Sequence, residues 1–211
     1  MWVNVYGVSE RYLNVYGEKD LRAQMNQFFH RTYTHPVDGT TLDMKMLCNW
    51  YWYDETAILE TGKGTKDWNF YRYAETLLSA AEAIAQSSGV NAEAAGYLAQ
   101  VKARANMEGK DASTITSELQ RLGKQAFIEE CWKERLREFP LEMKIWDDCV
   151  RTGKFPQISA TNKGEVQFVD LIGATNGSGA KFKETDLYWP IPVNEIQRNP
   201  NLTQNEGYSA K

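Results

Sequence analysis

The amino-acid sequence predicts an all-α fold, mainly helical with long irregular loops, and three observations support this prediction. In the stretch 67–107, apolar side chains recur every three or four residues, which is typical of helices that bury one face. The stretch 114–139 shows the same periodicity. The remaining parts, chiefly 1–64 and 155–184, have little periodicity and many Gly, Pro, Asn or aromatic residues.

The stretch 67–107 is predicted to fold as two helices packed against each other, a tetratricopeptide-like pair. Gly89 marks the end of the first helix, and Asn91 is suited to cap the start of the second. Alanine is frequent on both apolar stripes, so the two axes can approach toward the low end of the usual ~8–10 Å. Such a pair must pack on further helices to bury its outer face. The stripes are Tyr71, Ala74, Leu77, Leu78, Ala81 and Ala85 in the first helix, and Ala95, Leu98, Val101 and Ala105 in the second.

Fewer elements are predicted on either side of this pair. The N-terminal part is expected to be irregular, with one short helix near 20–28 and a loop over 31–41. One long helix should begin at an N-cap, Ser113 or Thr114, and run to about Phe139, burying Phe127 and Cys131.

Pro140 is predicted to open the next helix, 141–151, which would bury Met143 or Ile145 together with Trp146 and Val150. Residues 155–184 should form a surface loop with a short extended run at 167–172. One helical turn is expected after Pro192.

Composition excludes several classes of function. The 211 residues fit one domain, and the net charge of −4 argues against nucleic acid as a partner, because phosphate binding needs a basic surface. No run of about 20 apolar residues is present, and the first residues lack the pattern of a signal peptide. Three cysteines match no zinc spacing and are expected to be free, partly buried thiols, and no cofactor is predicted. His30 and His35 are too few to form a metal site.

Aromatic residues supply the main candidate for a ligand site. Four of them are consecutive, and they cannot all point the same way in any regular structure, so some should be exposed. Polar neighbours could bind the hydroxyl groups of a sugar stacked on these rings. Two interpretations stay open, because the same rings could instead fill the core or pack on neighbouring loops. The candidate ligand-binding residues are Asn49, Trp50, Tyr51, Trp52, Tyr53, Asp54 and Trp68.

Charged residues crowd the second half of the long helix. Glu130 and Glu134 share a face and could in principle form an acid–base pair. We interpret the cluster instead as exposed ion pairs, each contributing roughly 0.3–0.5 kcal/mol. A further hypothesis is that Arg135 and Glu138 turn inward and tie the helix to Arg72 or Glu75 of the helix pair.

The order of motifs resembles the SusD/RagB family, in particular its C-terminal half. Five segments carry the resemblance, and they lie in the family's order. Full family members are much longer, and three departures from the pattern are Lys102, Pro140–Met143 and Glu206. The segments are RYAETLL at 72–78, VKARA at 101–105, ERLREF at 134–139, KIWDDCVRTGK at 144–154, and WPIPVNEI at 189–196 with NPNLTQNEGY at 199–208.

This resemblance implies a SusD-like fold, with residues 1–66 as a loop-rich aromatic segment of the same domain and 67–211 as the C-terminal helical domain. It also implies a surface-exposed protein of the cell outer membrane, lipid-anchored in its full-length form. Its expected partners are a glycan or oligosaccharide and a SusC-like TonB-dependent transporter, and it is expected not to be an enzyme. Two other functions stay open: a helical-repeat adaptor that binds only protein, and a carbohydrate-active enzyme that uses Glu130 or Glu134.

Overall fold

The computed structural model describes residues 7–209. These residues form two compact units. The larger contains the chain up to Ile145 together with Ile158–Gln167, and the smaller contains Trp146–Gln157 and the chain from Phe168 onward. The predicted division at residue 66 stays a prediction. In the part of the chain described, no helix is long and apolar enough to cross a membrane.

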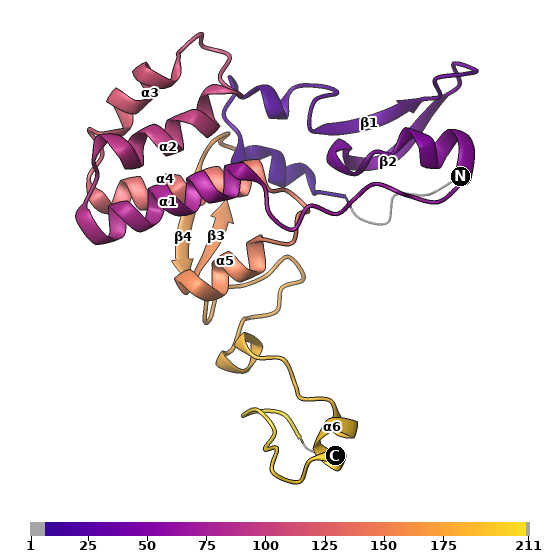
Figure 1. Cartoon of the computed structure of the whole chain (residues 1–211), viewed down its shortest axis with the longest axis vertical. Coiled ribbons are helices and arrows are strands. Elements are labelled where there is room, and N and C mark those ends of the chain that lie inside the picture. The colour runs from indigo at the N-terminus through magenta and orange to yellow at the C-terminus, as the bar shows by residue number, and fades with distance from the viewer. Residues whose placement is uncertain (1–6, 210–211) are drawn as a thin grey trace. The chain divides into compact units, whose positions relative to one another are not determined.

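The predicted helix pair is confirmed as α1 (Tyr73–Ser88) and α2 (Ala92–Ala103), which pack on each other and on α4 (Figure 1). Gly89 ends α1 with φ +82°, a conformation that costs glycine little. The side chain of Asn91 accepts a hydrogen bond of 2.9 Å from the amide of Ala94 and so caps α2. Side chains with no exposed surface fill the contact: Leu78, Ala81, Ala85, Ala94, Ala95, Leu98 and Ala99.

The single long helix predicted for 114–139 was wrong, because the chain forms two helices there. α3 (Ala112–Leu119) is capped by Asp111 rather than Ser113 or Thr114, and α4 spans Lys124–Glu138. Gly123 separates them in an extended conformation, consistent with the low helix propensity of glycine. The buried face of α4 was predicted correctly, since Phe127 and Cys131 have no exposed surface.

The N-terminal region contains a β-hairpin that the sequence analysis missed. β1 (Phe29–Thr34) pairs antiparallel with β2 (Thr41–Asn49), and an irregularity lies between His30 and Thr32. Of the loop predicted over 31–41, only residues 35–40 form a turn, and the rest belongs to the two strands. The helix predicted at 20–28 was also wrong, because only the short 3₁₀ turn Leu21–Ala23 forms there.

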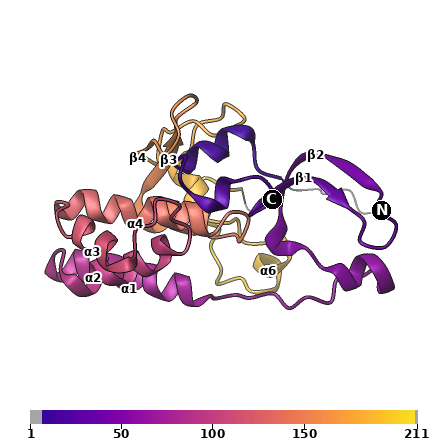
Figure 2. The same ribbon diagram turned by 90° about the horizontal axis from the view of Figure 1, so that it is seen from above.

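The segment before this hairpin docks on the end of α4 (Figure 2). It contains the 3₁₀ helix Glu10–Val15. The hydroxyl of Tyr12 donates a hydrogen bond of 2.6 Å to the carbonyl of Leu136, and that of Tyr16 donates one of 2.9 Å to the carbonyl of Arg137. Carbonyls in the last turn of a helix have no partner within the helix, so these phenols satisfy them.

Pro140 does not open the next helix, contrary to the prediction. Leu141 and Met143 both adopt φ +60°, so the chain turns before α5 begins at Ile145 and ends at Thr152. Met143 and Val150 are exposed, and Cys149 is the buried residue of α5.

Residues 155–184 are more ordered than the predicted loop. The extended run is confirmed as β4 (Val166–Asp170), which pairs with β3 (Lys154–Ile158), a strand that was not predicted (Figure 1). The helical turn after Pro192 is confirmed as α6 (Val193–Arg198). The side-chain amide of Gln204 accepts a hydrogen bond of 2.8 Å from the backbone N–H of Ile191 and donates one of 2.9 Å to its carbonyl. These two bonds close the tail on itself.

Candidate functional site

Trp50 lies inside a stack of rings. His30 stacks on it with ring centroids 3.8 Å apart, and Tyr53 stacks on it at 4.5 Å, both at an interplanar angle of 11°. Two parallel rings at these distances cannot share one face of the indole, so they cover opposite faces. Burial lowers the pKa of His30 and raises that of Tyr53 to about 12. Both faces of Trp50 are therefore occupied by the protein itself.

Tyr51 is flanked by two cations. The ammonium of Lys66 lies 5.2 Å from the ring centroid, and the guanidinium of Arg72 lies 5.5 Å from it, both within the range of cation–π attraction. The amide of Asn69 donates a hydrogen bond of 3.1 Å to the phenol. Tyr51 thus links the loop that follows β2 to the start of α1.

The two polar candidates hold the backbone. The amide of Asn49 donates a hydrogen bond of 2.6 Å to the carbonyl of Pro140, and its oxygen accepts one from the amide of Tyr51 at 2.9 Å. The carboxylate of Asp54 accepts hydrogen bonds from the amides of Thr65 (2.9 Å), Ala57 (3.2 Å) and Lys66 (3.2 Å), which lower its pKa. Both side chains therefore shape the loop. Their role toward a ligand stays a prediction.

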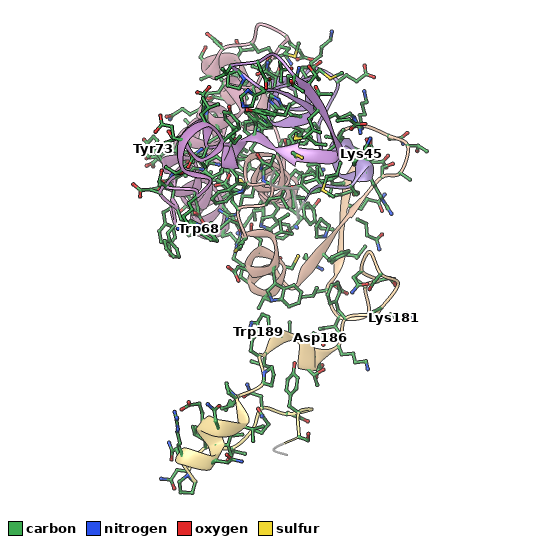
Figure 3. All side chains as sticks on the ribbon, turned by 90° about the vertical axis from the view of Figure 1, so that its right-hand side faces the viewer. Lys45, Trp68, Tyr73, Lys181, Asp186 and Trp189 are labelled. Atoms are coloured by element: carbon green, nitrogen blue, oxygen red, sulfur yellow. The ribbon has the colours of Figure 1, made fainter. Side chains whose placement is uncertain are left out.

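The remaining candidates, Trp52 and Trp68, form a group with Phe70, and we name these three rings the aromatic strip. Trp52 is half-buried, and the other two rings are exposed. Trp52 meets Trp68 edge to face at 5.3 Å, and Trp68 and Phe70 lie nearly parallel, at 21° and 6.2 Å. Trp68 is 50% exposed and Phe70 is 74% exposed, and Figure 3 shows Trp68 projecting from the surface. Trp68 and Phe70 lie on the segment that leads into α1, and Trp52 lies in the 3₁₀ turn Trp50–Trp52. The exposed faces of Trp68 and Phe70 can receive a flat apolar ligand.

Sequence reasoning missed the neighbours of Trp68. Phe70 is two residues away, on the same side of an extended chain, and this spacing was the available signal. Tyr71 was assigned to the buried stripe of the first helix, which was wrong, because α1 begins only at Tyr73 and Tyr71 is exposed. Lys144 lies over one face of the Tyr71 ring, 4.7 Å from its centroid.

The charged cluster of α4 is buried, so its interpretation as exposed ion pairs was wrong. Glu134 is 1% exposed and contacts Arg22 at 2.8 Å and Arg137 at 3.2 Å. Burial alone would raise the pKa of Glu134, but the charges of these arginines and of Lys102 outweigh it and lower the pKa. The charges of Lys102 and Arg137 likewise outweigh burial at Glu130 and lower its pKa to about 2.

The inward ties proposed for this helix are confirmed. Arg135 lies 3.4 Å from the carboxylate of Glu75, and Arg72 lies 3.0 Å from that of Glu138. Within residues 7–209, no group of three or more His, Cys, Asp or Glu side chains is arranged to hold a metal ion. The cysteines are buried, and burial raises the pKa of Cys149 to about 11.

Comparison with known proteins identifies relatives of this chain. The model of the SusD family matches residues 11–208. The chain is 36% identical over 138 residues to the starch-binding protein SusD of Bacteroides thetaiotaomicron, an alignment that covers 65% of this chain and 21% of that protein. A SusD superfamily protein from Parabacteroides distasonis has a crystal structure that matches with a TM-score of 0.78 at 31% identity, covering 95% of this chain and 41% of that one.

The chain thus spans less than half the length of either relative. The family match nonetheless extends over nearly all of its sequence, from the N-terminal 3₁₀ helix to the end of the tail. The same fold recurs in a solved superfamily member. On these grounds the chain belongs to the SusD family.

Proposed function

We propose that this protein binds glycans without catalysis, as the nutrient-binding component of an outer-membrane polysaccharide uptake system. The observation that carries the proposal is the aromatic strip. Sugar rings have apolar C–H faces that lose water favourably when they stack on indole or phenyl rings. Trp68 and Phe70 offer two such rings in nearly parallel orientation, on an exposed segment.

The other predicted ligand residues support this strip in the proposal. Trp50, Tyr51 and Tyr53 are held in stacks and cation–π contacts, and Asn49 and Asp54 fix the loop on which Trp52 lies. A rigid platform loses little conformational entropy when a ligand binds. The aromatic strip would therefore contact the glycan directly, while the rings of Trp50, Tyr51 and Tyr53 hold the strip in place.

The electrostatics of the glutamates favour binding over catalysis. A glycosidase needs a carboxylic acid whose pKa is raised enough to keep its proton near neutral pH. Neighbouring cations outweigh the effect of burial and instead lower the pKa of Glu130 to about 2, and they also lower that of Glu134. Both groups are therefore suited to ion pairing rather than to proton donation.

The proposal includes a place and a partner. The full-length protein would be lipid-anchored at the cell surface, in the outer membrane, and would pass oligosaccharide to a SusC-like TonB-dependent transporter. Family membership supports both statements. The name of the relative from Bacteroides thetaiotaomicron makes starch the first ligand to test.

Calorimetric titration with a panel of polysaccharides, starch included, tests this function. Trp68→Ala should weaken binding by about 30-fold, because covering roughly 80 Å² of indole at ~25 cal/mol per Å² contributes about 2 kcal/mol. Trp189→Ala is the matched control, since Trp189 is 82% exposed but lies in the smaller unit and outside the strip (Figure 3). It should bind as the unmodified protein does.

Equal affinity of the Trp68 variant and the unmodified protein would refute the role of the strip. Binding of a protein partner without any glycan would favour the helical-repeat adaptor. Release of shorter products from a glycan would require the enzyme instead.

A further inference from the structure

A concave site lies in the larger unit, outside the aromatic strip. It is a pocket of about 380 Å³ between the loop 17–20, the end of α2 and the second half of α4. This volume lies within the range of small-ligand pockets, ~300–1,000 Å³. We name it the polar pocket, because charged and amide side chains dominate its walls while Gly17 and Ala105 leave space between them.

The walls of the polar pocket are fixed by backbone hydrogen bonds. The amide of Leu21 donates to the carbonyl of Ala105 at 2.8 Å, and the amide of Met107 donates to the carbonyl of Lys19 at 3.0 Å. The loop is therefore tied to the residues that follow α2. The pocket forms part of the folded frame and requires no loop to close over it.

Arg137 lines this pocket and is incompletely paired. Its side chain is only 9% exposed. Its Nε donates to the carbonyl of Val15 at 3.0 Å, and its Nη1 donates to Glu130 at 2.9 Å and to Glu134 at 3.2 Å. Among the described residues, no acceptor is bonded to its Nη2. Hydrogen bonds from a charged donor are stronger than those from a neutral one, so a ligand that supplies an acceptor to this guanidinium is favoured.

Two further donors line the same space. The oxygen of the Asn106 side chain accepts a hydrogen bond of 2.6 Å from the amide of Glu108, while its Nδ2 makes no hydrogen bond to any described residue. Lys19 is exposed, and no carboxylate of a residue that the structure describes lies within ion-pair distance of its ammonium. A guanidinium, an amide and an ammonium together form a donor set suited to a carboxylate.

We infer that the polar pocket binds a small hydroxylated carboxylate, of the size of a sugar acid. Its carboxylate would accept hydrogen bonds from Nη2 of Arg137 and Nδ2 of Asn106, with Lys19 adding positive charge. Its hydroxyl groups would donate to the carboxylate of Glu18, which also lines the pocket. This site is independent of glycan capture on the aromatic strip.

Titration of the isotope-labelled protein with D-glucuronate, followed through its amide NMR signals, tests this inference, and D-glucose serves as the neutral comparison. Glucuronate should shift the amides of Lys19, Asn106 and Glu108 saturably, and glucose should not. Asn106→Asp keeps the oxygen that caps the turn but replaces the donor with a negative oxygen. It should weaken glucuronate binding at least about tenfold, since one hydrogen bond to a charged group is lost.

Two further variants test whether glucuronate binds in the polar pocket. Asn199→Asp is the matched control, because Asn199 accepts the same kind of bond from the amide two residues ahead, at 3.1 Å, and lies in the smaller unit. It should leave glucuronate binding unchanged, whereas Lys19→Gln should weaken it severalfold. The inference is overturned if glucose shifts the same amides equally, if no shift saturates, or if Asn106→Asp binds glucuronate unchanged. Loss of glucuronate binding in Trp68→Ala would also overturn it, by assigning the sugar acid to the aromatic strip.

Discussion

Replacing Glu134 by Gln should destabilise the fold strongly, although the two side chains have nearly the same shape. Glu134 lies at the centre of the buried charges of α4. Arg22 approaches one carboxylate oxygen at 2.8 Å, and Arg137 approaches the other at 3.2 Å. The ammonium of Lys102 lies 4.0 Å from it. The substitution removes the negative charge that these three cations share and places an N–H₂ group among them.

The magnitude follows from burial. The Glu134 side chain is 1% exposed and that of Arg22 is 6% exposed, so water can replace little of the lost interaction. Removing one partner of a buried ion pair costs about 3–5 kcal/mol. The lower end of this range applies here, because Arg22 keeps the carboxylates of Asp20 at 2.7 Å and Glu138 at 3.0 Å. In a protein of this size, each kcal/mol lowers the melting temperature by ~2–4 °C. We expect the melting temperature to fall by roughly 10 °C.

Calorimetry or thermal unfolding followed by circular dichroism measures this change. Glu129→Gln is the control, because Glu129 lies on the same helix but near the surface, where it accepts a hydrogen bond of 3.0 Å from Gln125. It should change stability by less than about 0.5 kcal/mol. If Glu134→Gln melts within 2 °C of the unmodified protein, as Glu129→Gln should, the reasoning about the buried ion-pair network is refuted.

Two further predictions concern acid stability and helix packing. The pKa of Glu130 is lowered from its ordinary value of 4.5 to about 2, so its stabilising effect is complete above pH ~5 and is lost as the pH falls toward 2. Urea titrations should show a falling midpoint over that window, less steeply in Glu130→Gln, and equal slopes for the two proteins would contradict the assignment. Ala81→Leu should cost about 1–3 kcal/mol in urea unfolding, because Ala81 has no exposed surface between closely packed helices. Ala83→Leu, on the exposed face of α1, should be nearly neutral, and equal losses in both would contradict close packing at Ala81.

Part of the N-terminal hairpin was readable in the sequence, but its signal was overlooked. Leu42, Met44 and Met46 alternate with polar residues, a strand pattern that matches the alternating burial of β2. Asp38 and Gly39 are typical turn residues between the two strands, and Gly39 adopts φ +72°. The pairing of the two strands was not readable, because it depends on contacts between segments that are separate in the sequence.

The candidate site was predicted in part. The expectation that four consecutive aromatics would not all be buried is met, since Trp50 to Tyr53 are each partly exposed. Which faces remain open could not be predicted. Trp50 is covered by His30, from β1, and Tyr51 is covered by Lys66 and Arg72. These partners are close in space through the hairpin and the loop, so only the folded chain assigns the open rings to the strip.

The sequence alone determined the features that depend on near neighbours. Periodicity and caps defined the helix pair, with Gly89 ending one helix and Asn91 beginning the next. The tertiary structure decided which charged side chains are buried and which partners they have. Arg22 lies more than a hundred residues before Glu134 in the chain, yet it enters the interior beside it. Whether a glutamate lies on a solvated helix face or inside an ion-pair network depends on which distant segment covers that face. The spacing of residues along the helix does not encode that contact.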